Sequence, residues 1–173
     1  MVDQEKGPGR VLGAEDGESF WQPAPHRGYM TIKVGPGVEG DADLGFAFGI
    51  QVMPPGCQVA EHGHARNTEI LFVYEGTGYA EIDGVREAIG PGSTIVLGKF
   101  VGHSVVNDGD TDMKFAWFFT PPGLDDVVRA MGVPREPGQD VPTEFAPPDN
   151  IREIAMAAGF AAPEQIAAAR PTR

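Results

Sequence analysis

The sequence predicts an all-β fold, a barrel or sandwich of short antiparallel strands that is followed by short helices. Among its 173 residues are 24 glycines and 16 prolines, a composition that favours many short elements joined by tight turns. Between these turns, apolar and polar residues alternate in short runs, as in strands with one buried face. No helical pattern separates these runs, which argues against parallel β-α-β units.

The strand pattern starts after residues 1–17, which are rich in glycine and charge and predict a flexible N-terminal arm. Turn-bounded extended segments follow one another closely. We expect strands at residues 19–23, 29–34, 46–53, 57–62, 69–74, 78–82, 85–89, 94–97, 103–106 and 113–119. Asp83-Gly84 predicts a type I′ hairpin between two of them. From this strand pattern we expect one barrel domain, at residues 18–121.

Beyond residue 121 the pattern becomes helical. Residues 124–131 form an amphipathic segment with acidic residues in its first turn. Asn150 to Glu153 resembles a capping box at the start of a second helix, and Pro163 suits the first turn of a third. We expect this extension, residues 122–173, to pack on the outside of the barrel and not to form a second domain.

The charge and the apolar content exclude several classes of protein. Lysine and arginine total 13 against 25 acidic residues, so the net charge of −12 offers no footprint for nucleic acid or an anionic membrane. No apolar run approaches the roughly 18 residues that span a bilayer, and the N-terminus lacks a signal-peptide core. Cys57 is the single cysteine. We therefore expect a cytoplasmic protein without disulfides, in which Cys57 is a buried apolar residue.

Three histidines and one glutamate form a candidate metal site. His62 and His64 are two residues apart, so in a strand both imidazoles project from the same face. Such a pair alone is a weak signal. Glu69 begins an apolar strand, where a carboxylate is costly unless it is paired or bound to a cation. His103 begins another. Glu69 as a salt-bridged strand residue and His103 as a core histidine are reasonable separately, but jointly the four residues favour one metal ion.

The spacing of these residues resembles the first motif of the cupin superfamily. Its fixed positions are matched by Gly56, His62, His64, Glu69 and Gly76.

A second stretch is similar to the second cupin motif, with Gly92, His103 and Asn107 at the expected spacing. Gly98 stands where the motif has proline, and Phe100 where it has glycine. We therefore expect a loop of different shape before His103, with the histidine itself retained.

The resemblance is to small single-domain metal-dependent cupins of the quercetinase-like or RmlC-like kind. It implies a double-stranded β-helix barrel of jelly-roll type, a homodimer, and a metal held by His62, His64, Glu69 and His103. Four protein ligands fill the tetrahedron that zinc prefers, whereas six-coordinate ions keep two positions open. We therefore favour Fe(II) or Mn(II), with Ni(II) and Co(II) as further candidates.

An open metal position beside an apolar interior predicts chemistry on a small organic substrate. The first hypothesis is a dioxygenase acting on an enolisable, partly apolar compound, with Glu69 as ligand and general base. The second is redox-neutral Lewis-acid catalysis, such as isomerisation, decarboxylation, lyase chemistry or polyketide cyclisation. The third is a non-catalytic protein that binds a small molecule through its metal.

Other side chains receive lesser roles. The interior is expected to contain Leu71, Val73 and Val105, with aromatic residues that belong to the core more than to a substrate box. These aromatic candidates are Phe46, Phe48, Phe115, Trp117 and Phe119.

The fourth histidine, His26, lies in a proline-rich loop and is interpreted as a surface residue and not a fifth ligand. Asn107 is expected to hold backbone. Residues 19–34 could pair across an exposed sheet edge in the homodimer.

Overall fold

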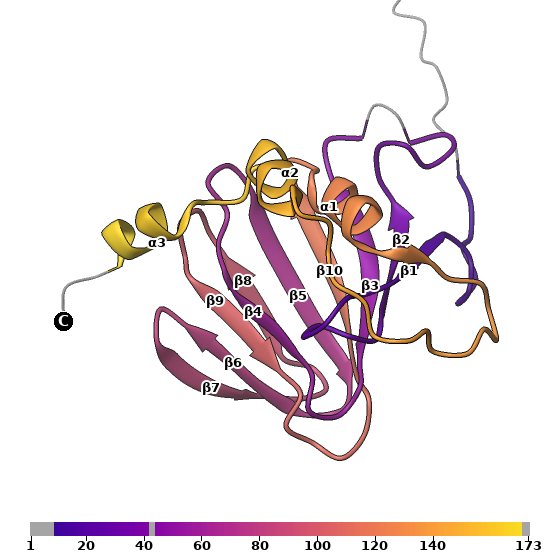
Figure 1. Ribbon diagram of the computed structural model, residues 1–173, viewed down its shortest axis with the longest axis horizontal. Coiled ribbons are helices and arrows are strands. Elements are labelled where there is room, and N and C mark those ends of the chain that lie inside the picture. Colours follow the sequence, from indigo (N-terminus) through magenta and orange to yellow (C-terminus); the bar gives the residue numbers. More distant parts are fainter. Residues whose placement is uncertain (1–8, 42–43, 171–173) are drawn as a thin grey trace, which may run out of the picture.

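The computed structural model describes residues 9–41 and 44–170 and forms two antiparallel sheets (Figure 1). The larger sheet has the strand order β11-β1-β2-β3-β10-β5-β8, and the smaller sheet has the order β4-β9-β6-β7. The strands are β1 (Glu18–Trp21), β2 (Tyr29–Val34), β3 (Ala47–Met53), β4 (Gln58–His62), β5 (Thr68–Glu75), β6 (Gly78–Ile82), β7 (Val85–Ile89), β8 (Thr94–Leu97), β9 (His103–Val106), β10 (Met113–Thr120) and β11 (Val133–Pro134). The helices are α1 (Leu124–Met131), α2 (Ile151–Ala157) and α3 (Pro163–Ala169). The predicted all-β fold with short C-terminal helices is confirmed.

The core lies between the two sheets because each strand turns alternate side chains inward. In β10 the residues Met113, Phe115, Trp117 and Phe119 are all buried, and those between them are half-buried. A side chain at Gly49 would overlap the carbonyl oxygen of Thr31 and the indole ring of Trp117. Glycine at this position therefore makes room for the largest side chain of the core.

The hairpin between β6 and β7 has the predicted turn. Asp83 and Gly84 both have positive φ, 48° and 80°, as a type I′ turn requires.

The N-terminal strands complete the larger sheet within the same chain. Residues 18–21 and 29–32 pair with each other, and β2 pairs in turn with β3. The expectation that residues 19–34 meet an exposed edge is wrong, because these strands are covered by β3 and by the short β11, which pairs with β1. Residues 1–8 of the predicted N-terminal arm lie outside the described residues. In the described part of the arm, the carbonyl oxygens of Gly13, Ala14 and Asp16 accept hydrogen bonds from the Lys33 ammonium.

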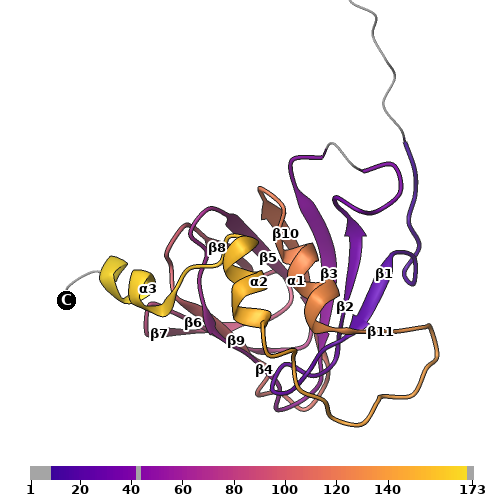
Figure 2. The ribbon, with the colours of Figure 1, turned by 45° about the horizontal axis from the view of Figure 1, so that its top comes forward.

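Helices α1 and α2 lie beside each other across one end of the two sheets, and α3 extends to the side (Figure 2). The Asn150 side chain makes no capping hydrogen bond within the described structure, so the expected capping box is absent although α2 begins at the next residue. The described helices are too short and too polar to cross a membrane.

Candidate metal centre

The His62-Gly63-His64 segment leaves β4 at the end of the barrel covered by α2. A side chain at Gly63 would come within 2.9 Å of the Val101 carbonyl oxygen, so glycine allows this close backbone approach. His64 then forms an isolated antiparallel bridge with Phe160 of the C-terminal extension. The segment is therefore held from two sides, and both imidazoles turn toward the interior.

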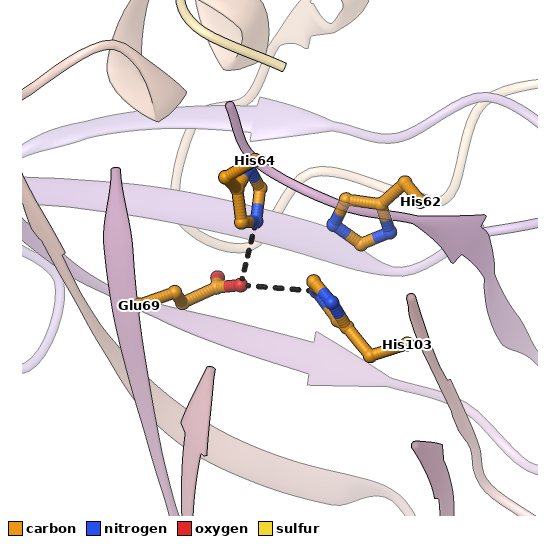
Figure 3. Close-up of side chains that lie close together, drawn as sticks. All are labelled: His62, His64, Glu69 and His103. Carbon is orange, nitrogen blue, oxygen red and sulfur yellow. Dashed lines mark hydrogen bonds and ion pairs between the residues drawn. The ribbon is translucent and has the colours of Figure 1, made fainter. Parts of the chain in front are cut away.

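Glu69 and His103 reach the same point from opposite sheets, Glu69 from β5 and His103 from β9 (Figure 3). His64, Glu69 and His103 are buried, at 0%, 5% and 2% exposure, and His62 is half-buried. One potential ligand atom from each of the four residues lies within 4.8 Å of the others. The structure thus brings together all four residues that the sequence singles out, and this cluster could hold a metal ion.

Hydrogen bonds to the backbone orient two of the imidazoles. His62 Nδ1 lies 2.9 Å from the Ala60 carbonyl oxygen, and His103 Nδ1 lies 3.0 Å from that of Val101. Because a carbonyl only accepts, each Nδ1 carries the proton and leaves a lone pair on Nε2 in the neutral ring. This is how histidine ligands of metals are usually fixed.

The chemistry of the four donors fits a bound cation. Glu69 Oε2 lies 3.1 Å from His64 Nε2 and 3.3 Å from His103 Nε2. The His103 Nε2 is buried and has no hydrogen-bond partner in the described structure. A lone pair that faces a carboxylate is repelled unless a proton or a metal ion lies between them.

Burial and the neighbouring groups shift two pKa values at the site. Burial lowers the pKa of His62 well below its usual value, and the nearby His103 and His64 lower it further. Burial would raise the pKa of Glu69, but the neighbouring imidazoles of His103 and His64 outweigh burial and hold that pKa below its usual value. Both residues therefore favour their ligand forms, a neutral imidazole and a carboxylate.

Phe160 covers the cluster from the C-terminal extension. Its ring stacks on His62 with centroids 5.5 Å apart and meets His64 edge-on at 4.7 Å. Two backbone hydrogen bonds fix this segment, Ala65 N–H to the Gly159 carbonyl and Ala161 N–H to the Gly63 carbonyl, at 2.7 and 2.8 Å. The extension was predicted to pack on the outside of the barrel; in addition, its Phe160 covers the cluster at the end of the barrel.

Phe100 lies in the loop before His103, at the position where the second cupin motif has glycine. Its φ of 61° lies in the left-handed region that glycine adopts without strain. Its N–H donates to the His64 carbonyl oxygen at 2.7 Å. The loop therefore keeps the backbone conformation of a glycine, and this hydrogen bond ties the approach to His103 to the His62-Gly63-His64 segment.

A cavity of about 210 Å³ opens from the cluster into the barrel. Its wall is mainly apolar, and α1, α2 and Phe160 contribute to it together with the strands. The residues that line it are Gln22, His26, Met30, Gln51, Val59, Ala60, Glu61, His62, Glu69, Leu71, His103, Val105, Phe115, Leu124, Val127, Met131, Ile151, Ala155 and Phe160.

The cavity corrects the interpretation of His26 as a surface residue. His26 is half-buried and lines the cavity, although it is not part of the four-residue cluster. Its place in an irregular loop gave no signal for this. Gln51 did have a sequence signal for a place at the cavity, because a polar residue at an inward position of a strand is unusual. For Phe160 the sequence offers only an isolated aromatic residue in an alanine-rich tail, which does not point to a site.

The aromatic candidates separate by strand register. Phe115 lines the cavity, whereas Trp117 and Phe119 are core residues. Phe46 and Phe48 are half-buried, and Phe46 stacks on Phe118 at 5.2 Å. Asn107 is fully buried and, as expected, holds backbone: its amide donates to the carbonyl oxygens of Met53 and Thr111.

Two facing antiparallel sheets with three histidines and a glutamate at one end are typical of a β-barrel protein that could bind a metal ion. Residues 49–119 match the family model described as Cupin domain. This match, together with structures of the same fold, supports a cupin domain in this part of the chain.

Known proteins that resemble the chain cover it only in part. Protein SchB of Streptomyces halstedii is 29% identical over 80 residues, which are 46% of this chain and 57% of SchB. The chain therefore spans little more than half of that relative. A predicted oxalate decarboxylase from Thermotoga maritima has a TM-score of 0.55 at 22% identity, over 65% of this chain and 98% of the other. A sugar phosphate isomerase from Silicibacter pomeroyi has a TM-score of 0.55 at 20% identity, over 66% and 77%. These likenesses show the fold alone.

Proposed function

We propose that this chain is a metal-dependent dioxygenase that acts on an enolisable, partly apolar small molecule. The observation that carries the proposal is the four-residue cluster at the end of an apolar cavity. A bound divalent ion would supply Lewis acidity and open positions for a substrate oxygen and dioxygen. Three nitrogen donors and one carboxylate suit Fe(II) or Mn(II), with Ni(II) and Co(II) as further candidates.

In the proposed reaction, each residue of the site would have its own role. His62, His64 and His103 hold the ion, and Glu69 both holds it and accepts the proton of the substrate hydroxyl. Leu71, Val105 and Phe115 give the substrate an apolar wall, and Phe160 keeps bulk water from the cluster.

The wall of the cavity favours an uncharged substrate. None of its described lining residues is lysine or arginine, and the carboxylate of Glu61 is paired with Arg170. Oxalate and sugar phosphates, which appear in the names of the two similar structures, carry anionic groups that lysine and arginine often bind, and the described wall has neither. The cavity therefore fits a neutral compound with an apolar body.

Oxygen uptake tests the proposal. The protein loaded with Fe(II) or Mn(II) is incubated with enolisable β-diketones and flavonols in an oxygen electrode, and products are followed by mass spectrometry. We expect one molecule of dioxygen consumed per molecule of product and no turnover under argon. Turnover that continues unchanged under argon would exclude a dioxygenase.

That outcome would favour the second candidate, redox-neutral Lewis-acid catalysis. One observation supports this candidate. His26 gives the cavity an imidazole outside the metal cluster, and burial lowers its pKa, so the ring is neutral and can accept a proton. Isomerisation and cyclisation both need such a second proton-transfer group.

Replacing Phe160 by alanine is expected to speed the loss of the ion to a chelator about tenfold, because the apolar cover that limits water access is removed. The release rate is measured with EDTA and a fluorescent metal indicator. Met156→Ala is the matched control, since Met156 is exposed on α2 at 48%. Equal release rates in the wild type and the Phe160 variant would contradict the role of Phe160.

We also propose that the chain forms a homodimer through the outer face of the larger sheet. Strand register places Phe48, Phe118, Ile70 and Val96 in one row across four strands, all pointing away from the core. Phe72 is 46% exposed and Val96 65%. An apolar sheet face of this kind is typical of a contact surface, and a second copy offers a matching one.

The double variant Phe72→Lys and Val96→Lys is expected to weaken the dimer at least about 100-fold, because two pairs of like charges would be buried at the contact. Sedimentation velocity measures the association. Val85→Lys is the control, since Val85 is 45% exposed on the other sheet. A wild-type protein that sediments as a monomer would contradict the proposed dimer.

A further inference from the structure

Three polar side chains interrupt the apolar wall of the cavity. Gln22 and His26 belong to the connection from β1 to β2, and Gln51 belongs to β3. The two glutamines are 4% and 5% exposed. Glutamine is mostly found at protein surfaces, so two such residues at one buried wall call for a functional reason.

The register of the larger sheet places Gln51 far from the metal cluster. Gln51 pairs with Phe115 of β10, which pairs with Val73 of β5, whereas Glu69 is across from Phe119. Glu69 is four residues along β5 from Val73, which corresponds to about 13 Å along the strand, and β3 and β5 are about 10 Å apart. Gln51 and the cluster therefore lie at opposite ends of the same cavity.

The loop that carries Gln22 and His26 is fixed by backbone hydrogen bonds. Gln22 N–H donates to the Gly28 carbonyl and Arg27 N–H to that of Pro23, both at 3.0 Å. Gln58 N–H reaches the Pro25 carbonyl at 3.4 Å and ties the loop to β4. His26 is thus held against the cavity without support from its own side chain.

Polar atoms at this wall lack partners inside the protein. Gln22 Nε2 donates to the Phe20 carbonyl at 3.1 Å, but the buried Gln22 Oε1 has no hydrogen-bond partner in the described structure. The same holds for the buried His26 Nδ1. Unpaired buried groups are unfavourable, so a small adjustment of either side chain toward a ligand would restore a hydrogen bond.

The chemistry of these groups selects the ligand. The Gln22 oxygen needs a donor, and the two glutamine amides and the neutral imidazole can both donate and accept. A hydroxyl group donates and accepts at once, whereas a carbonyl only accepts. The described cavity wall contains neither lysine nor arginine to pair with a carboxylate or a phosphate.

We propose that Gln22, His26 and Gln51 form a hydroxyl-binding subsite that anchors the end of the substrate remote from the metal. The substrate is then a neutral compound with an apolar body, an oxygen for the metal at one end and an alcohol or phenol at the other. This inference rests on the proposed function for the role of the metal end. The subsite itself needs no metal.

A pair of small fragments tests the subsite apart from the reaction. Benzyl alcohol and toluene differ only by the hydroxyl group, and their binding to the full chain is measured by NMR titration. An apolar cavity without polar partners prefers toluene, because a hydroxyl loses its hydrogen bonds to water. We expect the wild type to bind benzyl alcohol about five- to tenfold more tightly than toluene.

The variants Gln51→Leu, Gln22→Leu and His26→Phe are expected to reduce or reverse this preference. Gln58→Leu is the matched control, since Gln58 is exposed on β4 and outside the cavity wall. Circular dichroism confirms that each variant is folded, and His26→Phe lies in a loop and leaves the core strands unchanged. A preference that persists in all three variants, a wild type that prefers toluene, or no binding of either fragment would overturn the subsite.

Failure of the proposed function gives a different result. A wild type that binds no metal or consumes no oxygen would contradict the dioxygenase, yet the fragment preference would still be present. His103→Ala should likewise keep the preference for benzyl alcohol, because His103 lies at the other end of the cavity.

Discussion

Replacing His103 by alanine is expected to reduce metal affinity at least about 100-fold while the β-barrel stays folded. Loss of an outer partner of a metal ligand already costs 10- to 100-fold, so loss of a direct ligand should cost no less. His103 comes from the smaller sheet and faces Glu69 of the larger sheet, 3.3 Å away. Its removal leaves no donor from β9 in the cluster.

Elemental analysis of the purified protein measures this effect, and circular dichroism confirms the fold. His26→Ala is the matched control, because His26 is the one histidine outside the cluster and should keep full metal content. Full occupancy in the His103 variant would show that the ligand set is wrong. Equal loss in both variants would point to a general effect of histidine removal.

Replacing Asn107 by leucine is expected to lower the free energy of unfolding by about 3 kcal/mol. The Asn107 amide donates to the carbonyl oxygens of Met53 and Thr111 at 2.7 and 2.8 Å, and its Oδ1 accepts from Gly109 N–H at 3.1 Å. Asn107 is 0% exposed, so leucine would leave three backbone groups without partners away from water. The side chain joins the end of β3 to the turn before β10.

Urea denaturation followed by tryptophan fluorescence measures the change. Asp108→Ala is the neighbouring control and should stay within about 0.5 kcal/mol of the wild type, because Asp108 is exposed. An Asn107 variant as stable as the control would mean that the three backbone groups find other partners.

The strands could be predicted from the sequence because their signals are local. Alternation, proline and glycine mark the ends of β6 and β7 to the residue, and Asp83-Gly84 marks the turn between them. The ligand candidates were also accessible, since His62 and His64 are two residues apart and Glu69 lies in an otherwise apolar strand. These features depend on neighbours a few residues away.

The cover of the cluster could not be predicted in the same way. The bridge between His64 and Phe160 joins segments almost a hundred residues apart and involves backbone groups, which any residue provides. The short β11 could not be predicted for the same reason, because Val133-Pro134 becomes a strand only by pairing with β1. His26 reaches the cavity through the course of an irregular loop, and loops carry no periodic pattern.

The position of Phe160 in the chain has a consequence for biosynthesis. All four residues of the cluster have been synthesised once residue 103 is added, whereas their aromatic cover is synthesised 57 residues later. At about 5–20 residues per second this delay is several seconds. Strands β1 to β10 also precede the cover in the chain, so we expect the site to stay open to an ion until the C-terminal segment is made.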